Sequence, residues 1–227
     1  MRKVIYVPVI HMSADLGTIA KHLDKKAVAD FGEEFWRRHR ETIARFWDSV
    51  TNYFSNLQVE NVKIYQDALV AGGDIGQRII EEAAKAGSKN YELIANLLKR
   101  GAVLVRTEDL SLVREERDRI VKLTSARTPT EKLMAYVKYR LTKNRLLRKR
   151  DNYIVKRIDE TLNHGETSIL FMGAYHDIVP KLAKDIEVTQ VKDVKKIRDY
   201  QRFLLRTRKK KEVLENLAKY LISPVNQ

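Results

Sequence analysis

The sequence contains no cysteine. This absence excludes disulfide bonds, zinc sites built on thiolates and a cysteine nucleophile. Any metal ion that the chain binds must therefore be held by histidine, aspartate, glutamate or main-chain oxygen.

Long hydrophobic runs are also missing, because no stretch approaches the roughly 20 apolar residues that cross a bilayer. The N-terminus starts with Met1-Arg2-Lys3 and the apolar Val4–Ile10, as a signal peptide would. Pro8 and His11 interrupt this run, and no small-residue cleavage pattern follows. We therefore expect a first β-strand here, a cytoplasmic protein and no membrane partner.

Proline and glycine are scarce, with four and nine in 227 residues, and no repeat or low-complexity linker divides the chain. Hydrophobic residues make up 44% of the sequence, which is enough for a substantial core. We expect one domain over residues 1–227. The 33% of charged residues, combined with the lack of cysteine, is typical of thermophile-like proteins that rely on ion-pair networks.

The net charge of +14 is concentrated in two segments. Residues 136–157 carry nine Lys and Arg against one Asp, and residues 192–219 carry eleven against four acidic residues. Such basic segments attract phosphates, nucleic acids or acidic substrates. For most of these charges we favour a solvated helix face over a nucleic-acid contact.

Short hydrophobic runs alternate with helical patterns along the chain. Helical insertions are expected near 12–56 and 108–163, and a long basic helix is expected at 192–222. This alternation predicts an α/β fold with a largely parallel central sheet and long helical excursions. The expected strands are Val4–Ile10, Val62–Tyr65, Ala102–Arg106, Thr167–Met172 and Ile186–Val191.

Four of these strands are followed by a residue that can ligate metal or transfer a proton. The residues are His11, Asp67, Glu108 and His176. Because parallel strands open onto one edge of a sheet at their carboxyl ends, these side chains are expected to meet there. Imidazole and carboxylate groups suit both a divalent ion and general acid–base chemistry.

Each of these residues also has a purely structural interpretation. The histidines can cap helices and hydrogen-bond the main chain, and Asp109 can simply begin a helix. We favour a site in which His11, His176 and Asp67 hold metal while Glu108 and the histidines act as catalytic groups. Arg150, where the basic helix returns to an amphipathic pattern, is expected to bind an anionic substrate group in bidentate fashion.

Two segments resemble the TraB/Tiki/erythromycin-esterase superfamily. They are residues 150–158, beginning Arg150-Asp151-Asn152, and, after Gly165, residues 169–176, which end in Gly173-Ala174-Tyr175-His176. The family has an earlier Gly-x-x-His after its first strand, matched here by Pro8-Val9-Ile10-His11. Pro8 and Asp151 stand where glycine and asparagine are usual. The resemblance implies an α/β fold and, in some members, hydrolysis of peptide or ester bonds with or without metal.

These observations predict a hydrolase-like protein with a two-histidine site and a divalent metal ion of unassigned identity. Water is the expected nucleophile, since no serine elbow motif is present. The substrate would be an anionic small molecule or a peptide. The alternative is a nucleic-acid or nucleotide binding protein that uses the basic segments 136–157 and 192–219. A homo-oligomer that associates through the long helices is a further expectation.

Overall fold

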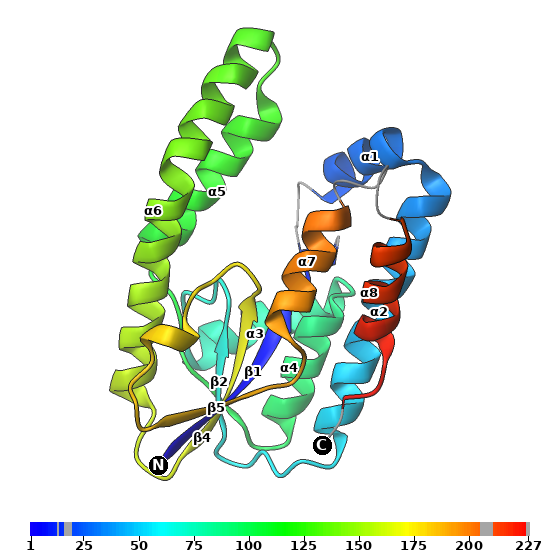
Figure 1. Ribbon diagram of the computed structural model, residues 1–227. Helices are drawn as coiled ribbons and strands as arrows, with labels where there is room; N and C mark the ends of the chain where they lie inside the picture. The colour runs from blue at the N-terminus through cyan, green and yellow to red at the C-terminus, as the bar shows by residue number, and fades with distance from the viewer. Residues whose placement is uncertain (13, 16–19, 205–210, 226–227) are drawn as a thin grey trace.

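A computed structural model describes residues 1–12, 14–15, 20–204 and 211–225. Its centre is a five-stranded, entirely parallel sheet with the strand order β3-β2-β4-β1-β5 (Figure 1). The predicted α/β fold with a parallel sheet and long helical excursions is confirmed. The strands are β1 (Arg2–Val9), β2 (Lys63–Gln66), β3 (Val103–Leu104), β4 (Thr167–Gly173) and β5 (Ile186–Gln190).

Helices cover both faces of the sheet. They are α1 (Ala20–Phe31), α2 (Glu33–Ser55), α3 (Gly73–Lys85), α4 (Lys89–Lys99), α5 (Leu110–Ser125), α6 (Pro129–Thr161), α7 (Val194–Leu204) and α8 (Lys211–Ile222). Alternate residues of each strand face opposite layers. Val7 and Val9 of β1 pack with α2, α4, α7 and α8, whereas Val4 and Tyr6 pack with the C-terminal part of α6.

Pro8 lies within a strand that has neighbours on both sides, where a missing N–H is normally costly. β5 pairs with β1 only from Arg2 to Tyr6. The carbonyl of Tyr6 accepts a hydrogen bond from the Val191 amide. The backbone N–H and C=O groups of even-numbered β1 residues are therefore directed toward β5. Pro8 therefore faces a position beyond the end of β5, where no ladder hydrogen bond is lost.

The region expected as one helix at 192–222 differs from the prediction. Two helices, α7 and α8, occupy it and pack against each other, and α8 also packs on α2. A single straight helix could not bury both Ile197 and Leu221 in the same core, as these two helices do. Residues 205–210 of the basic segment 192–219 lie outside the described residues.

Helices α5 and α6 form an antiparallel pair that extends well beyond the sheet (Figure 1). Thr128 and Glu131 form a capping box at the start of α6, with Pro129 in its first turn, as the sequence indicates. The buried residues of α6 lie in its second half and begin with Leu146, and Ile154 and Ile158 among them pack with strand residues. We call residues 110–145, which lie beyond that contact, the arm.

Candidate functional site

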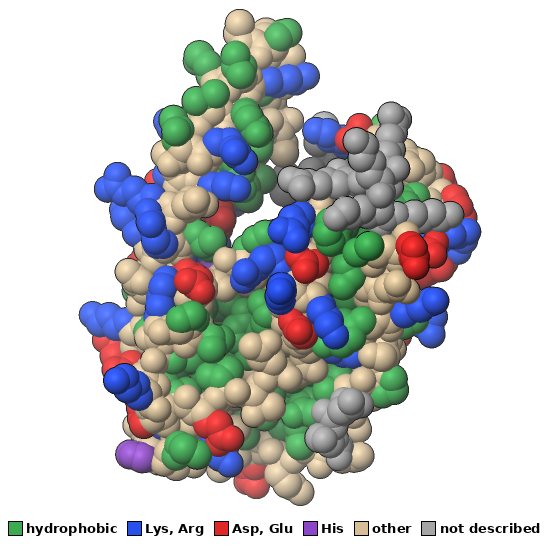
Figure 2. Space-filling model, in the orientation of Figure 1, with side chains coloured by type: hydrophobic (Ala, Val, Ile, Leu, Met, Phe, Trp, Pro, Cys, Tyr) green, Lys and Arg blue, Asp and Glu red, His purple; other side chains and the backbone are tan. Residues whose placement is uncertain are grey.

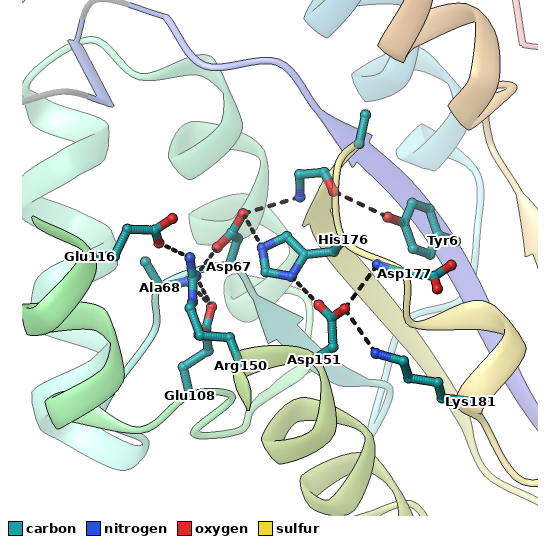
Figure 3. A network of polar contacts seen from close by, with 12 residues as sticks. Tyr6, Asp67, Ala68, Glu108, Glu116, Arg150, Asp151, His176, Asp177 and Lys181 are labelled. Carbon is teal, nitrogen blue, oxygen red and sulfur yellow. Dashed lines mark hydrogen bonds and ion pairs between the residues drawn. The ribbon is translucent and has the colours of Figure 1, made fainter. Parts of the chain in front are cut away.

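The segments that follow β2, β3 and β4 bring three predicted site residues together. Asp67, Glu108 and His176 each offer a ligand atom within 4.8 Å of the others, and all three side chains are buried. β2 and β4 are adjacent, so Asp67 directly faces the turn after β4. The expected convergence at the carboxyl edge of the sheet is thus present for these residues (Figure 3).

Local backbone geometry holds the two carboxylates in place. Ala68 has a φ of 61°, a left-handed conformation that is costly for a residue with a Cβ, and its N–H donates to Glu108 Oε1 at 2.8 Å. The amides of Thr107 and Glu108 both donate to the carbonyl of Leu69, at 3.0 and 2.9 Å. The loops after β2 and β3 are thereby tied together.

A tight turn places His176 beside Asp67. The His176 amide donates to the carbonyl of Gly173 at 3.0 Å, and the Gly173 amide donates to Asp67 Oδ2 at 3.1 Å. A Cβ at position 173 would lie 3.0 Å from the same carboxylate oxygen, so glycine permits this approach. Arg198 of α7 supports the turn with two hydrogen bonds to the carbonyl of Ala174, at 2.9 and 2.7 Å.

Arg150 is buried at the centre of the carboxylates. Its Nε donates to Glu108 Oε2 at 2.6 Å, and its Nη2 donates to Asp67 Oδ1 at 2.7 Å and to Glu108 Oε1. Nη1 forms an ion pair with Glu116 of α5. Its guanidinium is therefore directed at protein carboxylates rather than at open space, where the predicted substrate group would bind.

Asp151 orients the imidazole of His176. Its Oδ1 lies 2.7 Å from His176 Nδ1, and its Oδ2 accepts from Lys181 at 3.0 Å and from the Asp177 amide at 3.2 Å (Figure 3). With Nδ1–H donated to this carboxylate, Nε2 carries the free lone pair. Nε2 lies 3.7 Å from Asp67 Oδ2, which is longer than a hydrogen bond.

The charges of this cluster shift its ionisation. Burial disfavours the imidazolium of His176, but the charge on Asp67 and the hydrogen bond to Asp151 outweigh it and raise the pKa of His176. Burial also disfavours the carboxylates of Asp67 and Asp151. The cations around them prevail and lower the pKa of each, with His176 acting on both. Burial and the charge of Asp67 raise the pKa of Glu108 despite its bonds to Arg150.

His11 does not join the three convergent side chains among the described residues. β1 ends at Val9, and the His11 ring turns toward Asp15, with Nδ1 3.5 Å from its carboxylate and 45% of the side chain exposed. It still contributes to the positive charge that lowers the pKa of Asp67. The predicted joint ligation of one ion by His11 and His176 is not formed in this arrangement.

The convergent side chains fit a divalent ion in type, since two carboxylates and an imidazole are suitable ligands. Their oxygens, however, already bind the guanidinium of Arg150. An ion held by Asp67, Glu108 and His176 would compete with this cation for the same lone pairs. The side-chain arrangement favours a site neutralised by Arg150.

Asp151 and Glu116 were not predicted as site residues. A sequence pattern for Asp151 exists, because it shares the helical face of Ile154 and Ile158 at spacings of three and seven and is buried with them. Glu116 gives no such indication. Asp109 caps α5 by accepting from the amides of Ser111 and Leu112, so its structural interpretation is confirmed.

Comparisons of the chain with protein-family models, curated proteins and solved structures find no match. Among the described residues, no helix combines the length and apolar character needed to cross a bilayer.

Proposed function

We propose that the protein is a hydrolase in which His176 acts as a general base on water. The observation that carries this proposal is the 2.7 Å contact between His176 Nδ1 and Asp151. A carboxylate that accepts from Nδ1 fixes the tautomer and leaves Nε2 basic, as a proton-transfer role requires. We expect the reaction to take place in the cytoplasm.

In this proposal, Nε2 takes a proton from water while the water oxygen attacks the carbonyl carbon of an ester or peptide bond. The tetrahedral intermediate then collapses: its C–O or C–N bond to the leaving group breaks as the imidazolium gives this proton to the departing alcohol or amine, which leaves the carboxylic acid. Asp67 stabilises the imidazolium, since its carboxylate lies 3.7 Å from Nε2 and can bind the same water. The site lies at the carboxyl edge of the sheet, where ligands of open α/β folds bind.

Arg150 has a positioning role in this proposal. Its guanidinium binds both Asp67 and Glu108, and its charge helps to lower the pKa of Asp67 and offsets part of the rise that burial causes in the pKa of Glu108. Binding of an anionic substrate group by Arg150, as the sequence suggests, would require release of one of these carboxylates.

The test is hydrolysis of a panel of p-nitrophenyl esters and chromogenic peptides by wild type and by His176→Ala. We expect kcat to fall by about 10²-fold or more, the usual contribution of a general base. His164→Ala is the matched control, because His164 is exposed and its ring bonds the N-terminal amine, away from His176. Equal rates for His176→Ala and wild type, or no hydrolysis of any panel member, would refute the proposal.

Metal dependence is tested with the same substrates. The arrangement of Arg150 predicts that the rate is unchanged after dialysis against a chelator. Loss of the rate on dialysis and its recovery with one divalent ion would support instead a metal site on Asp67, Glu108 and His176. His11→Ala shows whether His11 is a second essential histidine, as the sequence predicts.

A further inference from the structure

The arm carries an unusual share of the exposed apolar surface. Seven of the thirteen large hydrophobic side chains that are exposed in the described residues belong to it. No residue of α5 is buried, and the first buried residue of α6 is Leu146. The two helices of the arm therefore do not form a core of their own. Figure 2 shows hydrophobic side chains gathered over its outer part.

Four of these side chains form a stripe on α6. Leu133, Val137 and Leu141 follow at intervals of four residues and are 63%, 45% and 77% exposed. Met134, which is 71% exposed, borders them. Residues at this spacing lie one above another on a helix. Ala135 and Tyr139 are less exposed, and helical geometry places them on the opposite side, toward α5.

The stripe lies within an exclusively basic stretch. Between Glu131 and Asp151 there are eight Lys and Arg residues and no acidic residue. Of these eight, only Arg150 is buried. None of the other seven forms an ion pair within the described part of the chain; they are Lys132, Lys138, Arg140, Lys143, Arg145, Arg148 and Lys149.

We propose that the arm docks on an anionic lipid surface through the stripe Leu133, Met134, Val137 and Leu141. Apolar side chains flanked by Lys and Arg are the features that place a helix in the headgroup region of an anionic membrane. The prediction of no membrane partner rests on the lack of a spanning segment. Docking at the surface does not require one, and the proposal is independent of the catalytic one.

Other occupants match the stripe less well. A second copy would bring the same seven cations against it, and a stable dimer takes about 20–30 residues from each side. Nucleic acid would match the charge, but its phosphates would not bury the four exposed apolar side chains. An anionic bilayer surface satisfies both features, because the side chains enter the acyl boundary while the cations contact phosphates.

The experiment is flotation of the full chain with vesicles of phosphatidylcholine, alone or mixed with phosphatidylglycerol. We expect binding to the mixed vesicles only, with a loss of bound protein as salt is raised from about 0.05 M to about 0.5 M. The variant Leu133→Gln/Leu141→Gln should reduce the partition coefficient about tenfold or more. Ile75→Gln/Val213→Gln is the matched control, because these exposed apolar residues lie outside the arm.

The proposal is overturned if wild type does not float with the anionic vesicles, or if the stripe variant binds them as wild type does. A concentration-dependent dimer that the stripe variant abolishes would assign the surface to a second copy instead. Binding of duplex RNA that displaces the vesicles and is insensitive to the stripe variant would assign it to nucleic acid. Thermal melts of both double variants verify that they are folded.

Discussion

The buried side chain of Asp151, on α6, binds the imidazole of His176. Its two oxygens bind three donors, namely His176 Nδ1, the Lys181 ammonium and the amide of Asp177. An asparagine at this position would supply the same shape without the charge. The aspartate therefore adds an electrostatic effect on the histidine that an amide cannot provide.

Replacement of Asp151 by Asn is expected to lower the pKa of His176. The hydrogen bond to the Asp151 carboxylate is one of the interactions that raise this pKa against burial. The measurement is an NMR titration of the imidazole, and any rate limb assigned to His176 should move to lower pH with it. Asp177→Asn is the control, since Asp177 is adjacent in sequence but exposed. An unchanged titration in Asp151→Asn would contradict the assigned contact.

Replacement of Arg150 by Met is expected to destabilise the protein by about 3–5 kcal/mol. Asp67 and Glu108 would remain buried without their cation, and an unpaired buried charge costs about this much. Urea denaturation measures the loss. Arg148→Met should have little effect, because Arg148 is exposed on the same helix. Equal unfolding free energies for the two variants would show that the cation is dispensable.

At the scale of elements, the two halves of the continuous helix α6 pack against different parts of the molecule. Its C-terminal half buries Ile154 and Ile158 against the sheet, whereas its N-terminal half packs mainly on α5. Arg150 and Asp151 stand near the junction of these halves. The site is consequently sensitive to the position of α6 and, through the ion pair between Arg150 and Glu116, to that of α5.

The capping box at the start of α6 is expected to stabilise the arm alone. Thr128→Ala removes the side-chain oxygen that accepts from the Glu131 amide at 3.2 Å, a loss of about 1 kcal/mol. Hydrogen exchange should accelerate within residues 110–145 and remain unchanged in the sheet. Thr142→Ala is the control, because its hydroxyl donates to the carbonyl of Lys138 inside α6 and takes no part in the cap. Faster exchange throughout the sheet would show that the arm and the sheet unfold together.

At the scale of the whole molecule, stability is expected to decline on both sides of neutrality. The pKa values of Asp67 and Asp151 are lowered from an ordinary value of 3.8, so these groups stabilise the fold above about pH 4 and cease to do so as acid protonates them. The pKa of His176 is raised from 6.5, so its contribution is complete below that pH and is lost as pH rises through the raised value.

The measurement is the unfolding free energy in urea at a series of pH values. Asp151→Asn should reduce the loss of stability at both acid and alkaline pH. It removes a carboxyl group whose pKa is lowered by folding and an interaction that raises the pKa of His176. Asp177→Asn should leave the profile as in wild type. A wild-type profile without an alkaline limb would mean that the histidine is not stabilised in its charged form.

The sequence by itself determined the strands and the edge where the site lies. Short hydrophobic runs that alternate with helical patterns indicate a parallel sheet, and Asp67, Glu108 and His176 meet where that topology requires. It also indicated the start of α6, because a capping box is a local pattern. These features depend on neighbours in the chain, so they can be recognised without the fold.

The tertiary structure decided which of those residues touch. His11 follows a strand as His176 does, yet the chain turns it toward Asp15, and no local pattern specifies that turn. The partners of Arg150 come from three separate loops and helices, as far as 83 residues away. Tertiary packing therefore determines that its guanidinium binds protein carboxylates and not a substrate group. The segment 192–222 likewise forms two helices, α7 and α8, and not one, because both pack into the same core. Contacts between distant segments are determined by burial and charge across the whole molecule. The spacing of residues along the chain does not specify these contacts.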